Sequence, residues 1–117
     1  MNKRAVGTKY EEKAALYLKD HGYEIIQKNY RCKIGEIDIV ASQGPYLVFV
    51  EVKYRMDAHS GSALDAVGYG KQQKILKTAK WYLMEHKISF THPCRFDVVA
   101  FDGERISLLQ DAFQYGA

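Results

Sequence analysis

The segment 47–53, Leu-Val-Phe-Val-Glu-Val-Lys, constrains the fold more than any other part of this chain. Its aromatic and β-branched residues predict a buried strand, yet a carboxylate, Glu51, and an ammonium group, Lys53, lie near its end. Because side chains alternate across a strand, both charges are expected on one face with Leu47 and Phe49, and the three valines on the other. Burying two charges costs on the order of several kcal/mol each unless a partner or a metal ion compensates. The segment therefore indicates a functional site.

Length and composition indicate a folded protein with one core. The chain has 117 residues, and we expect a single domain over residues 1–117. The hydrophobic fraction of 47% and the charged fraction of 26% exclude a largely disordered chain. The start, Met1–Val6, has no apolar run behind it and no segment is long enough to span a membrane, so we expect no signal peptide and a cytoplasmic protein. The net charge of +3 fits a polyanionic partner but does not alone indicate one.

The hydrophobic pattern predicts an α/β fold with the order helix, three strands, helix, two strands. The turns Ser42–Pro45 and Asp102-Gly103 predict hairpins, so the first three strands are expected to form an antiparallel meander. A helical crossover lets the third and fourth strands run parallel, which gives a mixed sheet with helices packed on it. The expected helices are about Thr8 to His21 and Lys71–Glu85, and the expected strands are Tyr23–Tyr30, Gly35–Ala41, Tyr46–Lys53, Arg95–Phe101 and Ile106–Leu109.

Two segments outside these elements are also assigned from the sequence. The stretch Arg55–Gly70 is rich in Gly, Ser and Ala, and we expect it to be the most mobile part of the chain, with His59 exposed in it. A short helical turn around Asp111–Phe113 is expected to close the domain.

A second carboxylate, Asp38, precedes the hairpin turn and is expected beside Glu51 if the second and third strands pair across Ser42–Pro45. Together they could bind Mg²⁺ or Mn²⁺, because Mg²⁺ commonly takes one or two protein carboxylates and keeps positions for water and phosphate. Such an ion can activate water and stabilise the leaving oxygen of a phosphodiester. Lys53 could then orient the attacking water or neutralise charge on the phosphate. The alternative is a solvated strand end where Glu51 and Lys53 simply pair.

Glu11 has two interpretations that the local sequence leaves open. It heads the apolar stripe formed by Ala14, Ala15 and Leu18, so it could point into the same cleft as the strand carboxylates. The segment Thr8–Glu11 also fits a capping box, in which Glu11 would reach back to the start of the helix.

Asp38, followed by Glu51 and Lys53 on the next strand and preceded by Glu11 on a helix, resembles the PD-(D/E)xK nuclease pattern. The form with a helix glutamate is that of archaeal Holliday-junction resolvases. The proline that names the motif is replaced by Ile37, at a position that varies widely in that superfamily. The resemblance implies that Asp38 and Glu51 ligate the metal, that Lys53 serves the nucleophile or the phosphate, and that Glu11 completes the acidic cluster and the metal site.

Nearly the whole chain resembles the bacterial YraN-like family, an uncharacterised family assigned to this nuclease superfamily. The similar segments are Gly7 with Glu11 and Ala14, Gly22-Tyr23, Asn29-Tyr30-Arg31, Gly35-Glu36-Ile37-Asp38, Phe49 to Lys53 with Arg55, Lys71-Gln72, and Arg95-Phe96-Asp97. The resemblance implies a restriction-endonuclease-like domain of three layers, in which helices flank a mixed sheet.

Basic and polar side chains around the predicted site are candidates for nucleic-acid contacts, namely Arg31, Lys33, Arg55, Lys71 and Gln72. Lys77 and Lys80 are expected on a solvated helix face. Phosphate contacts give affinity without sequence readout, and the chain has no recognition helix or zinc module. We therefore expect a metal-dependent nuclease that selects the structure of its substrate, such as junctions, flaps or single strands, with DNA favoured over RNA. The alternative is a non-catalytic nucleic-acid-binding module on a nuclease fold.

The resolvase resemblance also admits a homodimer, which paired cleavage of a two-stranded substrate would indicate. No stretch of the chain identifies an interface for it.

Overall fold

The computed structural model describes residues 3–55 and 67–115. Its elements are α1 (Lys3–Asp20), β1 (Glu24–Arg31), β2 (Glu36–Gln43), β3 (Tyr46–Arg55), α2 (Tyr69–Glu85), β4 (Cys94–Asp102) and β5 (Arg105–Phe113). The predicted α/β class and the order αβββαββ are confirmed. Most predicted bounds differ from the observed ones by one or two residues.

The five strands form one mixed sheet in the order β1-β2-β3-β4-β5. Strands β3 and β4 are parallel and the other neighbours are antiparallel, which confirms the predicted meander and the helical crossover. The turn between β2 and β3 contains Gly44 with a φ of 56°, a left-handed conformation that glycine adopts without strain. The turn between β4 and β5 uses Gly103 in the same way, with a φ of 62°.

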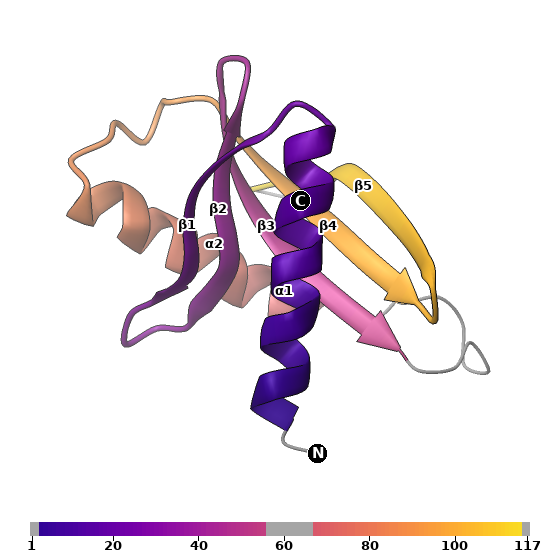
Figure 1. The fold of residues 1–117 in the computed structure, drawn as a ribbon. Helices are drawn as coiled ribbons and strands as arrows, with labels where there is room; N and C mark the ends of the chain where they lie inside the picture. Colours follow the sequence, from indigo (N-terminus) through magenta and orange to yellow (C-terminus); the bar gives the residue numbers. More distant parts are fainter. Residues whose placement is uncertain (1–2, 56–66, 116–117) are drawn as a thin grey trace.

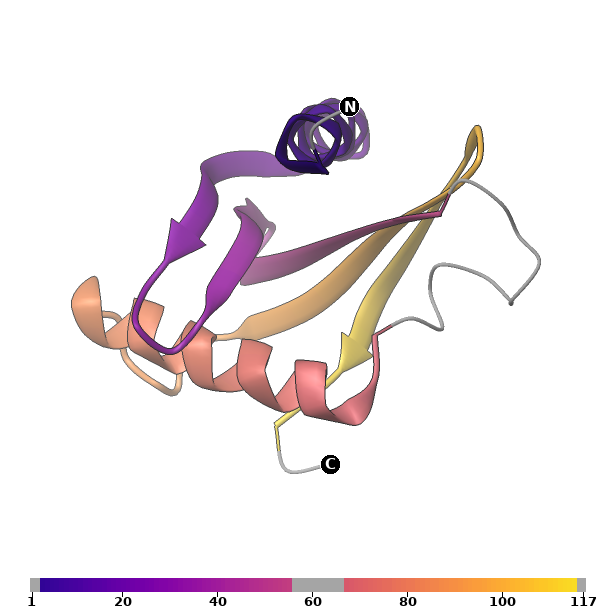
Figure 2. The same cartoon turned by 90° about the horizontal axis from the view of Figure 1, so that it is seen from below.

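Helices α1 and α2 cover opposite faces of the sheet, so the molecule has three layers (Figures 1 and 2). This arrangement is compatible with a restriction-endonuclease-like fold. On the α1 face, Ala14, Ala15 and Leu18 pack against strand residues that include Val48 and Val50. The helix therefore buries the apolar stripe that the sequence predicts.

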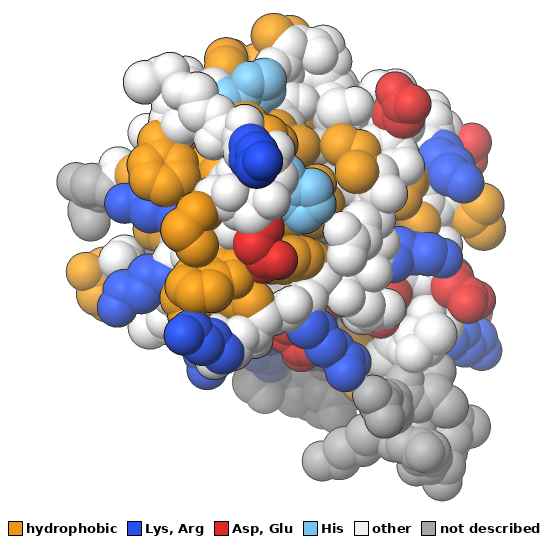
Figure 3. Space-filling view, turned by 90° about the vertical axis from the view of Figure 1, so that its left-hand side faces the viewer, with side chains coloured by type: hydrophobic (Ala, Val, Ile, Leu, Met, Phe, Trp, Pro, Cys, Tyr) orange, Lys and Arg blue, Asp and Glu red, His pale blue; other side chains and the backbone are white. Residues whose placement is uncertain are grey.

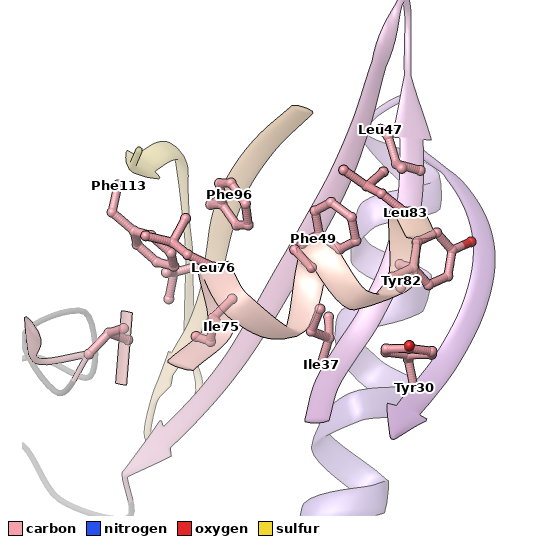
Figure 4. Close-up of a cluster of buried hydrophobic side chains, with 14 residues drawn as sticks. Tyr30, Ile37, Leu47, Phe49, Ile75, Leu76, Tyr82, Leu83, Phe96 and Phe113 are labelled. Carbon is pink, nitrogen blue, oxygen red and sulfur yellow. The ribbon is translucent and has the colours of Figure 1, made fainter. Parts of the chain in front are cut away.

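The α2 face holds the larger, aromatic part of the core, in which Phe49 stacks on Phe96 with ring centroids 5.4 Å apart (Figure 4). Leu47 and Phe49 lie on this face, whereas Val48, Val50 and Val52 lie on the other, as the alternation of segment 47–53 predicts. Helix α2 contributes five of the expected apolar residues, Ile75, Leu76, Ala79, Tyr82 and Leu83, all buried.

Helix α1 begins earlier than predicted, at Lys3. Thr8 therefore lies inside the helix and cannot be its N-cap, so the capping-box interpretation of Glu11 is wrong. The first residues of the helix carry no apolar stripe, which is why the pattern placed its start too late.

The helical turn predicted at Asp111–Phe113 is also wrong, because β5 continues through these residues. Phe113 pairs with Phe96 of β4 and stacks on its ring at 5.3 Å, so burial of an aromatic side chain extends the strand. The register shifts between Phe96 and Val98, where Asp111 adopts a φ of 55° and donates its backbone N–H to Asp97 Oδ1 at 2.9 Å.

Most of the predicted loop Arg55–Gly70, including His59, lies outside the described residues. In the described part of the chain, neither helix has the length and apolar character needed to cross a membrane.

Candidate active site

The carboxylate of Asp38 marks the place where β2 and β3 stop pairing through their backbones. The β2–β3 register runs from Gln43↔Tyr46 to Ile39↔Val50. One step farther, the backbone N–H of Val52 donates to Asp38 Oδ2 at 2.8 Å. The Asp38 side chain thus replaces a backbone carbonyl of β2 as the hydrogen-bond acceptor for Val52. On its other edge, β3 stays paired with β4 as far as Arg55↔Asp102.

Glu51 lies on the α2 face of β3 and is only 5% exposed. Two ammonium groups flank its Oε1 atom, Lys53 Nζ at 3.5 Å and Lys71 Nζ at 3.4 Å. The side chain of Lys53 is 26% exposed and that of Lys71 is 44% exposed, so the cations reach from the surface toward a buried anion. The predicted pairing of Glu51 with Lys53 therefore exists, but at a buried strand end instead of a solvated one.

Asp38 and Glu51 lie close enough for each to shift the pKa of the other, as the sequence predicts. Burial and the neighbouring Asp38 raise the pKa of Glu51 from its ordinary value of 4.5 to about 7, although Lys71 and Lys53 act against the rise. Burial also raises the pKa of Asp38, against the hydrogen bond from Val52. Both carboxyl groups therefore favour the protonated form. A cation bound between them would stabilise their ionised forms.

Glu11, from α1, joins the same cluster. Burial, followed by the charge of Asp38, raises the pKa of Glu11 from 4.5 to about 7. With its amide nitrogen turned toward Glu11, Asn29 donates to the two carboxylate oxygens at 2.8 and 3.2 Å. Of the two interpretations of Glu11, the structure supports the one that directs it toward the strand carboxylates.

Asn29 is a site residue that the sequence analysis did not single out. It lies within β1 with a φ of 57°, a left-handed conformation that Asn adopts more readily than most residues. The available signal was an Asn within an otherwise strand-like segment, a position where Asn has low propensity and needs a local reason.

The residues predicted to contact nucleic acid have different surroundings. Lys71 reaches Glu51, and the exposed Arg31 pairs with Glu36 at 3.2 Å. Lys33 Nζ lies 5.1 Å from the centre of the Trp81 ring.

Gln72 donates its amide to the carbonyl of Val67 at 3.0 Å, at the start of α2. Arg55, half-buried at the end of β3, accepts the backbone N–H of Gly103 through its carbonyl. Contacts of these residues with nucleic acid remain predictions.

Among residues 3–55 and 67–115, no group of three or more His, Cys, Asp or Glu side chains is arranged as a metal site. The structure brings together Asp38, Glu51 and Lys53 with Glu11 and Lys71, but as a network of carboxylates and ammonium groups.

The model of one protein family matches residues 10–101 of this chain, and its description is "Uncharacterised protein family UPF0102". A UPF0102 protein of Lachnoclostridium phytofermentans is 48% identical over 118 aligned residues, which span all of both chains. A UPF0102 protein of Legionella pneumophila (strain Philadelphia 1) is 41% identical over 92% of this chain and 94% of its own. One of Haemophilus ducreyi is 47% identical over 87% of this chain and 82% of its own. None of these names states an activity.

Proposed function

The chain belongs to the uncharacterised protein family UPF0102, the YraN-like family that its sequence resembles, and we propose that it is a divalent-metal-dependent nuclease. The observation that carries the proposal is a pair of carboxylates, the half-buried Asp38 and the buried Glu51, where β2 and β3 separate. Their raised pKa values mean that ionising both opposes folding, and a fold built for stability alone gains nothing from such a pair.

The donor set suits Mg²⁺ or Mn²⁺. Asp38 and Glu51 offer hard oxygen ligands from rigid strands, and Mg²⁺ commonly binds one or two protein carboxylates. When bound, the ion would supply an activated water and a positive charge beside the phosphate. Glu11 would complete the acidic cluster, and with a pKa of about 7 it can exchange a proton with water near neutral pH.

The two lysines have separable roles in this proposal. Lys53 Nζ lies 3.5 Å from Glu51 and can donate to a phosphate oxygen as charge develops there. Lys71, on the more exposed side, holds Glu51 from α2 and offers a second cation to the substrate.

The proposed substrate is nucleic acid, with DNA favoured and with selection by structure instead of sequence. The basic residues that the sequence predicts to contact nucleic acid, Arg31, Lys33, Arg55 and Lys71, suit phosphate contacts. No element of the described residues supports reading of base edges.

The direct test is cleavage of branched, flapped and single-stranded DNA, and of single-stranded RNA, with Mg²⁺, Mn²⁺ or a chelator. We expect metal-dependent cleavage that falls at least about 100-fold in Glu51→Gln and Lys53→Met, as for removal of a positioned catalytic group. Lys77→Met, an exposed lysine on α2, is the matched control and should keep full activity. Cleavage that survives Glu51→Gln would come from a contaminating nuclease and would reject the proposal.

One observation favours a second candidate, a nucleic-acid-binding module without catalysis. Lys53 and Lys71 already neutralise Glu51, so an ammonium pair occupies the place where a metal ion would act. Salt-sensitive DNA binding together with no metal-dependent cleavage of any tested substrate would support this candidate over the nuclease.

A further inference from the structure

A groove of about 340 Å³ lies between the β1–β2 turn and the first half of α2. It is lined by Arg31, Cys32, Gly35, Glu36, Lys71, Lys74 and Ile75. On the side of the molecule that carries β1 and β2, Lys and Arg side chains gather along the lower part of the surface (Figure 3). The charged residues that line the groove are therefore mostly cationic, and the groove lies outside the carboxylate pair.

The charges of the groove come from both of its walls. Lys71 and Lys74 lie on α2, and Arg31 is the last residue of β1, just before the turn. Glu36 is the acidic residue of the lining, and its pairing with Arg31 at 3.2 Å is exposed on both sides. Exposed ion pairs contribute little free energy, so a phosphate can replace Glu36 as the partner of Arg31 at low cost.

Close packing of the turn against α2 sets the floor of the groove. A Cβ atom added at Gly35 would lie 2.9 Å from Thr78 Oγ1 and 3.4 Å from Lys74 Cε. Thr78 is held in turn by donating to the carbonyl of Lys74 at 2.8 Å. The turn also closes on itself, since the N–H of Cys32 donates to the carbonyl of Gly35 at 2.9 Å. Both walls are thus rigid elements.

Lys71 connects the groove to the carboxylates, because it lines the groove and also lies 3.4 Å from Glu51. Lys33 lies on the β1–β2 turn but is absent from the lining, and its ammonium group lies over the Trp81 ring. Lys71 and Lys74 therefore face the groove, whereas Lys33 does not.

We propose that this groove binds a backbone phosphate of a single nucleic-acid strand, next to the phosphodiester that reaches Asp38 and Glu51, with Arg31 and Lys74 as its cationic ligands. The inference rests on the proposed function and deepens it, since it assigns the path of the strand on the α2 side of the sheet. The groove of about 340 Å³ is large enough for one backbone phosphate.

The experiment measures binding of short fluorescein-labelled single-stranded DNA by anisotropy, in chelator, so that no cleavage occurs. We expect Lys74→Ala and Arg31→Ala to weaken binding roughly three- to tenfold, as for loss of one ordinary hydrogen bond at an exposed site. The slope of log affinity against log salt should fall by about 0.7 for each lost contact with a single strand. Gly35→Ala should weaken binding as well, because its methyl group displaces the turn from Thr78.

Lys77→Ala is the matched control, since it removes the same charge from α2 without touching the lining. A series of DNAs with one neutral methylphosphonate linkage at successive positions locates the contact. The loss in Lys74→Ala should disappear for one position only. Equal losses in Lys74→Ala and Lys77→Ala, or the same loss at every position, would mean a diffuse attraction and would overturn the proposal. Thermal melting monitors the fold of each variant.

The experiments distinguish a wrong groove proposal from a wrong nuclease proposal. Glu51-dependent cleavage together with equal effects of Lys74→Ala and Lys77→Ala rejects the groove alone. Linkage-specific coupling to Lys74 without cleavage of any substrate supports the groove as a binding site and rejects the nuclease.

Discussion

Lys71 Nζ lies 3.4 Å from Glu51 Oε1, so the first turn of α2 is joined to the charged end of β3. The carboxylate is buried and the lysine is largely exposed. Among the groups around Glu51, Lys71 has the largest effect in lowering its pKa, ahead of Lys53. A partly exposed residue of one layer thereby lowers the pKa of a buried residue in another, against the larger rise that burial and Asp38 cause.

Lys71→Met should raise the pKa of Glu51 above its value of about 7, by roughly 0.5–1 because the lysine is partly solvated. NMR titration of the side-chain carboxyl carbons measures it. Lys77→Met is the control and should leave the titration of Glu51 unchanged. An unchanged pKa in Lys71→Met would show that the pair does not persist in solution.

Stability of the metal-free protein should depend on pH through Glu51. Its pKa is about 7 when folded and about 4.5 when unfolded, so the folded state holds the proton more tightly. The resulting stabilisation is complete below pH 4.5 and is lost as the pH rises to 7. Glu51→Gln keeps the neutral form at every pH, so it should raise the free energy of unfolding at pH 8 by about 1–3 kcal/mol.

Urea unfolding of wild type and Glu51→Gln at pH 8 and pH 5 measures this difference. The gain at pH 5 should be much smaller than at pH 8. An equal gain in the free energy of unfolding at pH 5 and pH 8 would contradict a role of the Glu51 charge. A loss at pH 8 would mean that Lys53 and Lys71 stabilise the ionised carboxylate by more than its burial costs.

Divalent metal should reverse the penalty at neutral pH. An ion bound by ionised Asp38 and Glu51 stabilises the folded state by RT ln(1 + [L]/Kd), about 2.7 kcal/mol at 100 times Kd. The melting temperature at pH 7.5 should therefore rise with Mg²⁺ or Mn²⁺ in wild type. Asp38→Asn should abolish the rise, whereas Glu36→Gln, which alters an exposed carboxylate paired with Arg31, should keep it.

The fold was largely predictable because its signals are local. Alternation in segment 47–53, the turn residues Gly44 and Gly103, and the apolar positions of α2 each determine one element, and the parallel crossover follows from their order. The start of α1 and the end of β5 were not predictable in the same way. Neither has an apolar period, and the second depends on Phe113 pairing with Phe96, a contact between distant residues.

Only the site residues whose positions follow from strand pairing and alternation were predictable from the sequence. Asp38 and Glu51 follow from the hairpin between β2 and β3, and Lys53 follows from the alternation of β3. Lys71 and Asn29 depend on how the helices and β1 pack against the sheet. No local sequence pattern specifies the distance from Lys71 to Glu51 or from Asn29 to Glu11. These two contacts could therefore be identified only from the structure.

Asp97→Ala should be strongly destabilising without affecting the metal response. Asp97 is fully buried and accepts hydrogen bonds from the hydroxyl of Tyr23 at 2.6 Å and from Arg95 at 2.9 Å, so it forms a structural ion pair with Arg95. Its removal leaves Arg95 without its buried anion, and breaking such a pair costs about 3–5 kcal/mol. Urea unfolding should show this loss. Tyr23→Phe should lose less, about 1–3 kcal/mol, since it removes the hydroxyl that donates to Asp97 and accepts from Arg95 and Gln110 but leaves the Arg95–Asp97 ion pair in place. The rise in melting temperature with Mg²⁺ should persist in both variants, because none of the bonds of Asp97 involves Asp38 or Glu51. A loss below about 1 kcal/mol in Asp97→Ala would contradict the assignment of this network as a main support of the fold.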